Sequence, residues 1–237
     1  MTTIIATVVE HASASDCEAF RGGVLQQPVN TTSSLVLLAV GLWIVARAAR
    51  DRASARFELG AFGVGMTAVG VGSVVFHGSA PGWSLWFHDL SGLATLMVIL
   101  ALHLGSRWRW GERRTAIVIA TGTALFALVL AVAPASTVPI AFVLAPVAAL
   151  SIGAVARDGR HPGTGGGRPD RNTPWLIAIA ALGLGGIAYL LGRSSSSWCD
   201  PRSVLQWHAV WHVLVAVAAA AFPLAALGIG PISKVEP

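Results

Sequence analysis

Charged residues are scarce in this sequence, which has 237 residues of which only 11% are charged. A soluble globular domain carries about 25% charged residues, so this chain has too few to cover a surface that faces water. The same scarcity, together with 54% hydrophobic residues, excludes intrinsic disorder. A bilayer span needs roughly 20 apolar residues, so seven spans use about 140 residues and leave no room for a sizeable soluble domain.

Long apolar runs are abundant, and seven of them are long enough to cross a bilayer. They cover residues 33–49, 57–78, 88–106, 115–133, 138–156, 174–192 and 204–229. Polar residues typical of a helix start precede the first span at 30–33 and the sixth at 172–173. The sequence therefore predicts an all-α polytopic membrane protein, a bundle of seven transmembrane helices. Its expected divisions are a segment over 1–32, the membrane domain over 33–229 and a tail over 230–237.

Basic residues gather in alternate loops between these spans. Of the 16 lysine and arginine residues, 13 fall in the first, third and fifth loops and the C-terminal tail, and only 3 fall elsewhere. Cytoplasmic loops collect arginine and lysine, so we expect the N-terminus outside and the C-terminus in the cytoplasm. The net charge of +5 therefore reflects membrane topology, and no nucleic-acid partner is expected.

Cysteine is nearly absent, with Cys17 before the first span and Cys199 before the seventh. An even number of crossings separates them, so both are expected on the extracytoplasmic face. Cysteines that share an oxidising compartment are candidates for a disulfide, here between the N-terminal segment and the last outer loop. Two free thiols are the alternative, because sequence spacing alone does not bring two Cα atoms together.

Four of the seven histidines fall at one predicted depth, near the outer ends of the spans. His77 ends the second span, His88 and Asp89 begin the third, and His208 and His212 begin the seventh. His208 and His212 are four residues apart and so lie on one helix face, which lets two imidazoles share a metal ion. Ionisable residues inside a membrane span are rare and usually functional.

Three neutral imidazoles with a fourth coordination position open are typical of a catalytic zinc site. Asp89 would hold or deprotonate the water, and Ser73, one helical turn before His77, would donate a hydrogen bond to a substrate oxygen. Two alternatives stay open. One is a hydrogen-bonded pair of His208 and His212 inside a helix bundle, and the other is a b-type haem held by two histidines.

Small residues form one face of the second span. Gly63, Gly70 and Ser73 share this face with His77. Because small residues let helix backbones approach closely in a membrane, we expect another helix to pack tightly there.

Five short blocks of the sequence, taken in order, resemble the alkaline ceramidase family. The blocks are Asp16-Cys17-Glu18, Asn30-Thr31-Thr32-Ser33-Ser34, Gly72-Ser73-Val74-Val75-Phe76-His77, Asp89, and His208-Ala209-Val210-Trp211-His212. That family is part of a superfamily of seven-helix membrane hydrolases that includes the adiponectin-receptor-like and Per1-like proteins. The resemblance implies a zinc ion held by His77, His208 and His212, with Asp89 and Ser73 as catalytic residues and a disulfide between Cys17 and Cys199.

The sequence departs from the family pattern near the N-terminus, where the family binds calcium. Glu18 and Asp16 remain, but Phe20 and Gln27 stand where polar or acidic ligands are expected. This departure argues against calcium as a cofactor. The interval between His77 and the aspartate is also slightly longer than in the family, which makes His88 an alternative to Asp89.

These observations predict a zinc-dependent membrane hydrolase that cleaves the amide or ester bond of a lipid from the extracytoplasmic side. The expected substrate is ceramide or another N-acyl lipid, and Asp89 would act as general base and then as general acid. The alternative is a non-catalytic receptor or helper in which Asp89 is the fourth ligand of a structural zinc. The alanine-, arginine- and glycine-rich composition is typical of a bacterial protein, so we expect a bacterial plasma membrane.

Overall fold

The computed structural model describes residues 16–50, 56–158 and 172–226. Within these ranges the chain forms seven α-helices and one 3-10 turn, and no β-strand. The elements are α2 (Pro28–Arg50), α3 (Arg56–His77), α4 (Ser84–Arg107), α5 (Glu112–Val132), η1 (Pro134–Ser136), α6 (Thr137–Asp158), α7 (Asn172–Leu191) and α8 (Trp207–Ala226). The all-α prediction is confirmed, and each helix overlaps one predicted span. The predicted tail 230–237 and the first part of the segment 1–32 lie outside the described residues.

Five of the helices, α2 to α5 and α7, are long and apolar enough to cross a membrane. Helices α6 and α8 contain shorter apolar stretches within the described side chains, Pro134–Ala148 and Trp207–Pro223. These lengths agree with a helical membrane protein. The number of crossings and the orientation of the termini remain predictions.

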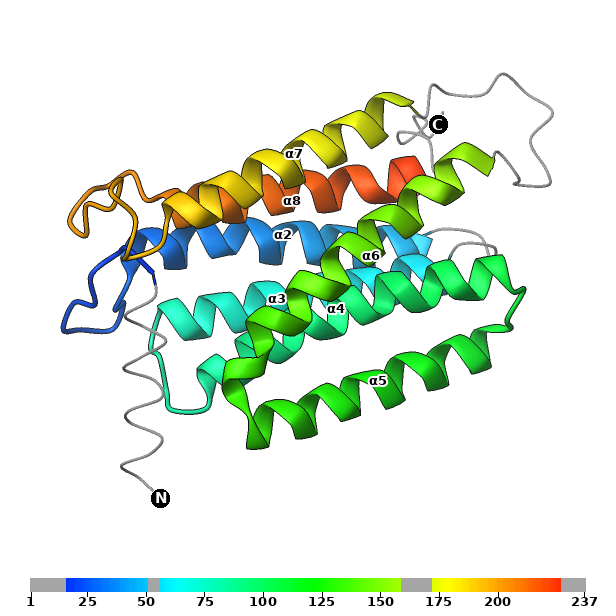
Figure 1. Cartoon of the computed structure of the whole chain (residues 1–237), viewed down its shortest axis with the longest axis horizontal. Helices are drawn as coiled ribbons and strands as arrows, with labels where there is room; N and C mark the ends of the chain where they lie inside the picture. The colour runs from blue at the N-terminus through cyan, green and yellow to red at the C-terminus, as the bar shows by residue number, and fades with distance from the viewer. Residues whose placement is uncertain (1–15, 51–55, 159–171, 227–237) are drawn as a thin grey trace.

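The helices run side by side along the long axis of the molecule, and α6 crosses the others obliquely (Figure 1). Helix α2 packs against α3 and α8, α4 packs against α3, α5 and α6, and α7 packs against α8. The connections alternate between the two ends. The start of α2, the α3–α4 loop and the α7–α8 loop therefore lie at the same end, on the left in Figure 1.

Helix α2 begins at Pro28, ahead of the predicted residue 33. Its start is stabilised from a distance, because the Glu18 carboxylate accepts hydrogen bonds from the backbone N–H groups of Val29 and Asn30, at 2.9 and 2.8 Å. A carboxylate at this position satisfies free N–H groups and interacts favourably with the helix dipole. The polar residues that were expected to precede the helix therefore form its first turns.

Close contact between α2 and α3 confirms the predicted small-residue face. A Cβ atom added to Gly70 would collide with the backbone of Leu38, and one added to Gly63 would lie 2.9 Å from the backbone nitrogen of Val45. With the backbones so close, even short side chains reach across the interface. The hydroxyl oxygens of Ser34 on α2 and Ser73 on α3 lie 2.9 Å apart.

The interior is divided into an apolar part and a polar part. The apolar core joins α2, α3, α4 and α8 and includes Ile44, Leu59, Phe62, Met66 and Phe222. The polar part lies toward the ends of α3 and the starts of α2 and α8, and its buried members include Glu18, Gln27, Asn30, Ser34, Ser73, His77, His208 and His212. A cluster of buried polar side chains is costly unless hydrogen bonds or a bound ion compensate it, so this end of the bundle is the candidate functional site.

Candidate metal centre

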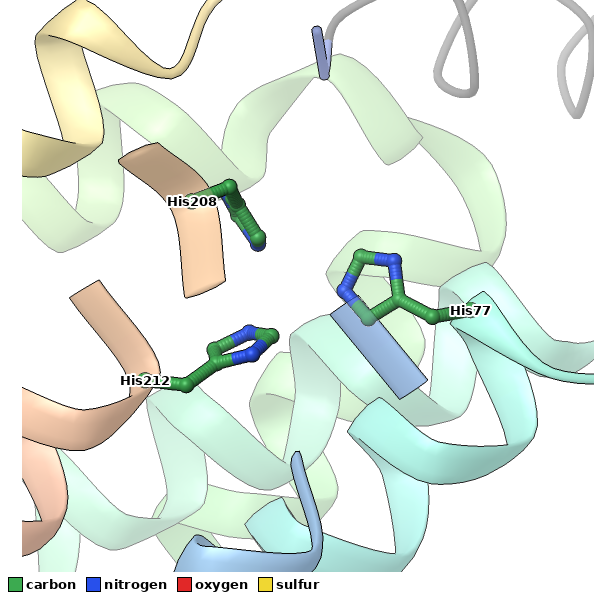
Figure 2. Close-up of side chains that lie close together, drawn as sticks. All are labelled: His77, His208 and His212. Atoms are coloured by element: carbon green, nitrogen blue, oxygen red, sulfur yellow. The ribbon is translucent and has the colours of Figure 1, made fainter. Parts of the chain in front are cut away.

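Three histidines form the centre of the buried polar region. His77 comes from the end of α3, and His208 and His212 come from successive turns at the start of α8 (Figure 2). The ring centroids are 5.1 Å apart for His77 and His208, 5.2 Å for His77 and His212, and 4.6 Å for His208 and His212. One nitrogen atom from each ring lies within 4.8 Å of the others, so the three side chains together can hold a metal ion.

Burial removes these rings from water. The exposed fractions are 0% for His77, 4% for His208 and 2% for His212. The Nε2 atom of His77 and both ring nitrogens of His208 are buried without a hydrogen-bond partner. Buried polar atoms of this kind are rare and call for an explanation, such as an ion that binds them.

Ser73 lies at the edge of the cluster, one turn before His77 on α3. Its hydroxyl oxygen is 3.3 Å from Nε2 of His212 and 2.9 Å from the hydroxyl of Ser34. The structure thus brings together the three predicted metal ligands and the predicted hydrogen-bond donor.

Asp89 lies apart from the three histidines and bonds two other side chains. Its Oδ1 atom is 3.0 Å from Nδ1 of His88, and its Oδ2 atom accepts a hydrogen bond of 2.7 Å from the Thr137 hydroxyl of α6. His88 lies beside the cluster, with its ring centroid 5.9 Å from that of His77. The backbone of His88 also packs against Gly72, where an added Cβ would lie 3.1 Å from the His88 Cα.

The two cysteines form a disulfide, with Cα atoms 5.4 Å apart. The predicted pairing is confirmed, and the alternative of two free thiols is wrong. The backbone N–H of Cys17 also donates to the carbonyl of Gly192 at the end of α7, at 2.8 Å. The disulfide and this hydrogen bond hold the N-terminal segment over the starts of α2 and α8.

Residues of this N-terminal segment contact the histidines. The sequence did not predict these contacts. Gln27 Oε1 lies 2.6 Å from His77 Nδ1, and Asp16 Oδ1 lies 3.4 Å from His208 Nδ1. Burial raises the pKa of the Asp16 carboxyl to about 6, although the nearby charges of His88 and Arg193 lower it. The only sequence signal for Gln27 was its departure from the family's calcium pattern.

Comparison with known proteins agrees with the resemblance found in the sequence. A family model described as Ceramidase matches residues 25–227, a range that contains all the described helices and the three histidines. No curated protein matches the chain. Because the match covers most of the chain, the protein belongs to the ceramidase family, whose activity is hydrolysis of a lipid.

Proposed function

We propose that this protein is a zinc-dependent lipid amidase that hydrolyses the amide bond of ceramide or of another N-acyl lipid. Membership of the ceramidase family supports the lipid substrate and the hydrolytic reaction. The long apolar helices support a setting in the bilayer, where such a substrate resides. The reaction adds water across the amide bond and releases a fatty acid and an amine.

The unpaired nitrogen atoms of the buried histidines carry this proposal. Neutral imidazole is a preferred zinc ligand, and three of them here keep candidate ligand atoms within 4.8 Å of one another. Nε2 of His77 and Nε2 of His208 have no other partner among the described residues. The donor set therefore fits zinc, which would be held by His77, His208 and His212.

The number of ligands favours a catalytic metal over a structural one. A structural zinc site has four protein ligands, whereas a catalytic site has three and leaves one position for water or substrate. In the part of the chain that the structure describes, the group of candidate ligands contains three histidines and no carboxylate. Asp89 bonds His88 and Thr137 instead, which disfavours the alternative of a receptor or helper with Asp89 as fourth ligand.

Side chains around the metal site are suited to the remaining catalytic roles. Bound at this site, zinc would lower the pKa of a coordinated water to about 7 and polarise the carbonyl of the amide. Ser73, whose hydroxyl lies beside Nε2 of His212, is suited to donate a hydrogen bond to the developing oxyanion. His88 donates its Nδ1–H to Asp89, so its Nε2 is free to take a proton from the attacking water and return it to the leaving nitrogen.

The proposal is tested by measuring zinc content and ceramide hydrolysis in one preparation of the purified full chain. We expect about one zinc ion per chain and release of fatty acid from ceramide. The variant His212→Ala should lose both. His103→Ala is the matched control, because it removes an imidazole of α4 that is not among the candidate ligands. Wild-type protein without zinc, or hydrolysis that persists in His212→Ala, would contradict the proposal.

A further inference from the structure

Residues 16–33, which we call the N-terminal strap, contact one ring nitrogen of every histidine in the cluster. In each case the nitrogen is Nδ1. The contacts are Gln27 Oε1 to His77 at 2.6 Å, Ser33 Oγ to His212 at 2.9 Å, and Asp16 Oδ1 to His208 at 3.4 Å. Three side chains of one continuous segment thus face the Nδ1 atoms of three histidines. These histidines belong to two other helices, α3 and α8.

The hydrogen bonds of Gln27 determine which tautomer His77 adopts. The Gln27 side-chain amide donates to the backbone carbonyl of Glu18 at 2.6 Å, so its oxygen, which only accepts, faces His77. His77 must therefore carry its proton on Nδ1. Its Nε2 keeps a lone pair, and this is the atom that is buried without a partner.

The same argument applies to His212. The Ser33 hydroxyl donates its single proton to the carbonyl of Asn30 at 2.9 Å, so its oxygen accepts from Nδ1 of His212. His77 and His212 therefore both carry their lone pair on Nε2, and in His212 this atom lies 3.3 Å from the Ser73 hydroxyl. Asp16 Oδ1 faces Nδ1 of His208 at 3.4 Å without forming a hydrogen bond, so this contact orients the ring but does not fix its tautomer.

We propose that the N-terminal strap is the outer ligand shell of the metal site, in which Gln27 and Ser33 position His77 and His212 and Asp16 faces His208. This inference rests on the proposed function, because it takes His77, His208 and His212 as metal ligands. Partners on the second nitrogen fix the tautomer and ring orientation of a metal-bound histidine. Loss of one such partner typically lowers metal affinity by about 10–100-fold.

The strap is itself held in place on both sides of the cluster. The backbone N–H of Gln27 donates to the carbonyl of His77 at 2.8 Å, which joins the strap to α3. The disulfide from Cys17 joins it to the loop before α8. Within the strap, the Glu18 carboxylate accepts hydrogen bonds from the N–H groups of Val29 and Asn30 and so ties its first residues to the start of α2. Asp16, Gln27 and Ser33 are therefore parts of one segment that is attached to the bundle at several points.

The test measures metal binding without using activity. Zinc affinity is determined by competition with a chelating dye, and the absorption spectrum of the Co²⁺ form reports the coordination geometry. Gln27→Met keeps the side-chain length but removes the acceptor, so zinc affinity should fall by about 10–100-fold and the Co²⁺ spectrum should change. The control is Gln26→Met, because the neighbouring Gln26 amide bonds the carbonyl of Ser79 and not a histidine. Its affinity and spectrum should match those of the wild type.

A second pair of variants covers the case in which Gln27→Met fails to fold. Ser33→Ala should lower zinc affinity, and Ser33→Thr, which keeps the hydroxyl, should restore it. Zinc affinities of Gln27→Met and Ser33→Ala equal to that of Gln26→Met would overturn the inference. If wild-type zinc binding still depends on His212 in that case, the proposed function stands; if the wild type binds no zinc, both are wrong.

Discussion

At the scale of single residues, Ser73 has one proton and two neighbours that can accept it. The Ser34 hydroxyl donates to the carbonyl of Asn30 at 2.6 Å, so its oxygen is an acceptor for Ser73. Nε2 of His212 is the second acceptor. When a metal occupies that lone pair, Ser73 retains only Ser34 as an acceptor within this network. A substrate oxygen can then replace Ser34 as the acceptor of that proton.

Replacing Ser73 by alanine should therefore reduce hydrolysis and leave the metal in place. Loss of one hydrogen-bond donor to an oxyanion typically lowers kcat by about 10²-fold. Zinc content, measured by mass spectrometry of the metal, should equal that of the wild type. Thr67→Val is the control, because the Thr67 hydroxyl on the same helix bonds the carbonyl of Gly63, one turn earlier. A variant that loses zinc would instead place Ser73 among the residues that hold the metal.

His88 and Asp89 resemble the base and its orienting carboxylate in other hydrolytic sites. We expect His88→Gln to retain zinc and to lower kcat by about 10²–10⁴-fold, because the proton acceptor is lost. Asp89→Asn should also retain zinc, since Asp89 is not among the candidate ligands, and should lower kcat. Steady-state kinetics on ceramide checks both. An active His88→Gln beside an inactive Asp89→Asn would assign the base to Asp89 itself.

At the scale of elements, the start of α2 combines a structural and a functional role. Glu18 accepts the N–H groups of Val29 and Asn30, and this cap extends the helix back to Pro28. The extension places Ser33 inside the helix, on the turn that faces His212. Residues 30–33 thus resemble a helix-start signal in the sequence but lie inside the helix. They become part of the site because Glu18 caps the helix instead.

The disulfide should contribute to stability through the segment that it fixes. Cys17 and Cys199 are separated by 182 residues, and a disulfide typically stabilises a fold by about 2–4 kcal/mol. We expect Cys199→Ser and the double variant with Cys17→Ser to have the same lowered Tm. Thermal unfolding of the purified protein measures this, and treatment of the wild type with a reductant should give the same shift. A Tm that does not change would show that the hydrogen bonds of the segment suffice without the disulfide.

At the scale of the whole molecule, the sequence predicts the features that depend on the length of apolar runs and on the alternating direction of successive helices. Apolar runs of bilayer length predict each helix, and the alternation of helix ends places His77, His208 and His212 in one layer. The contacts of Gln27 and Asp16 were not predictable in this way. They arise because an irregular segment folds over the bundle end, and no sequence period describes that path.

The orientation of the bundle is the remaining prediction at this scale, and two independent arguments support it. The positive-inside rule places the N-terminus outside, because 13 of the 16 lysine and arginine residues fall in loops and a tail on the opposite side. The disulfide lies at the end of the bundle that holds the histidines, and disulfides form and persist in oxidising compartments. We therefore expect the metal site to face the extracytoplasmic side of a bacterial plasma membrane.

Reporter fusions in a bacterial host can check this orientation directly. Alkaline phosphatase, which needs disulfides to fold, should be active when fused before Met1 and inactive when fused after Pro237. Green fluorescent protein, which fluoresces after folding in the cytoplasm, should give the opposite pattern. Fusions truncated after the α4–α5 loop and after the α7–α8 loop serve as controls, because an odd number of helices separates these loops and they should report opposite sides. If both ends report the same side, one of the seven helices does not cross the membrane, and α6 and α8, with their shorter apolar stretches, are the first to re-examine.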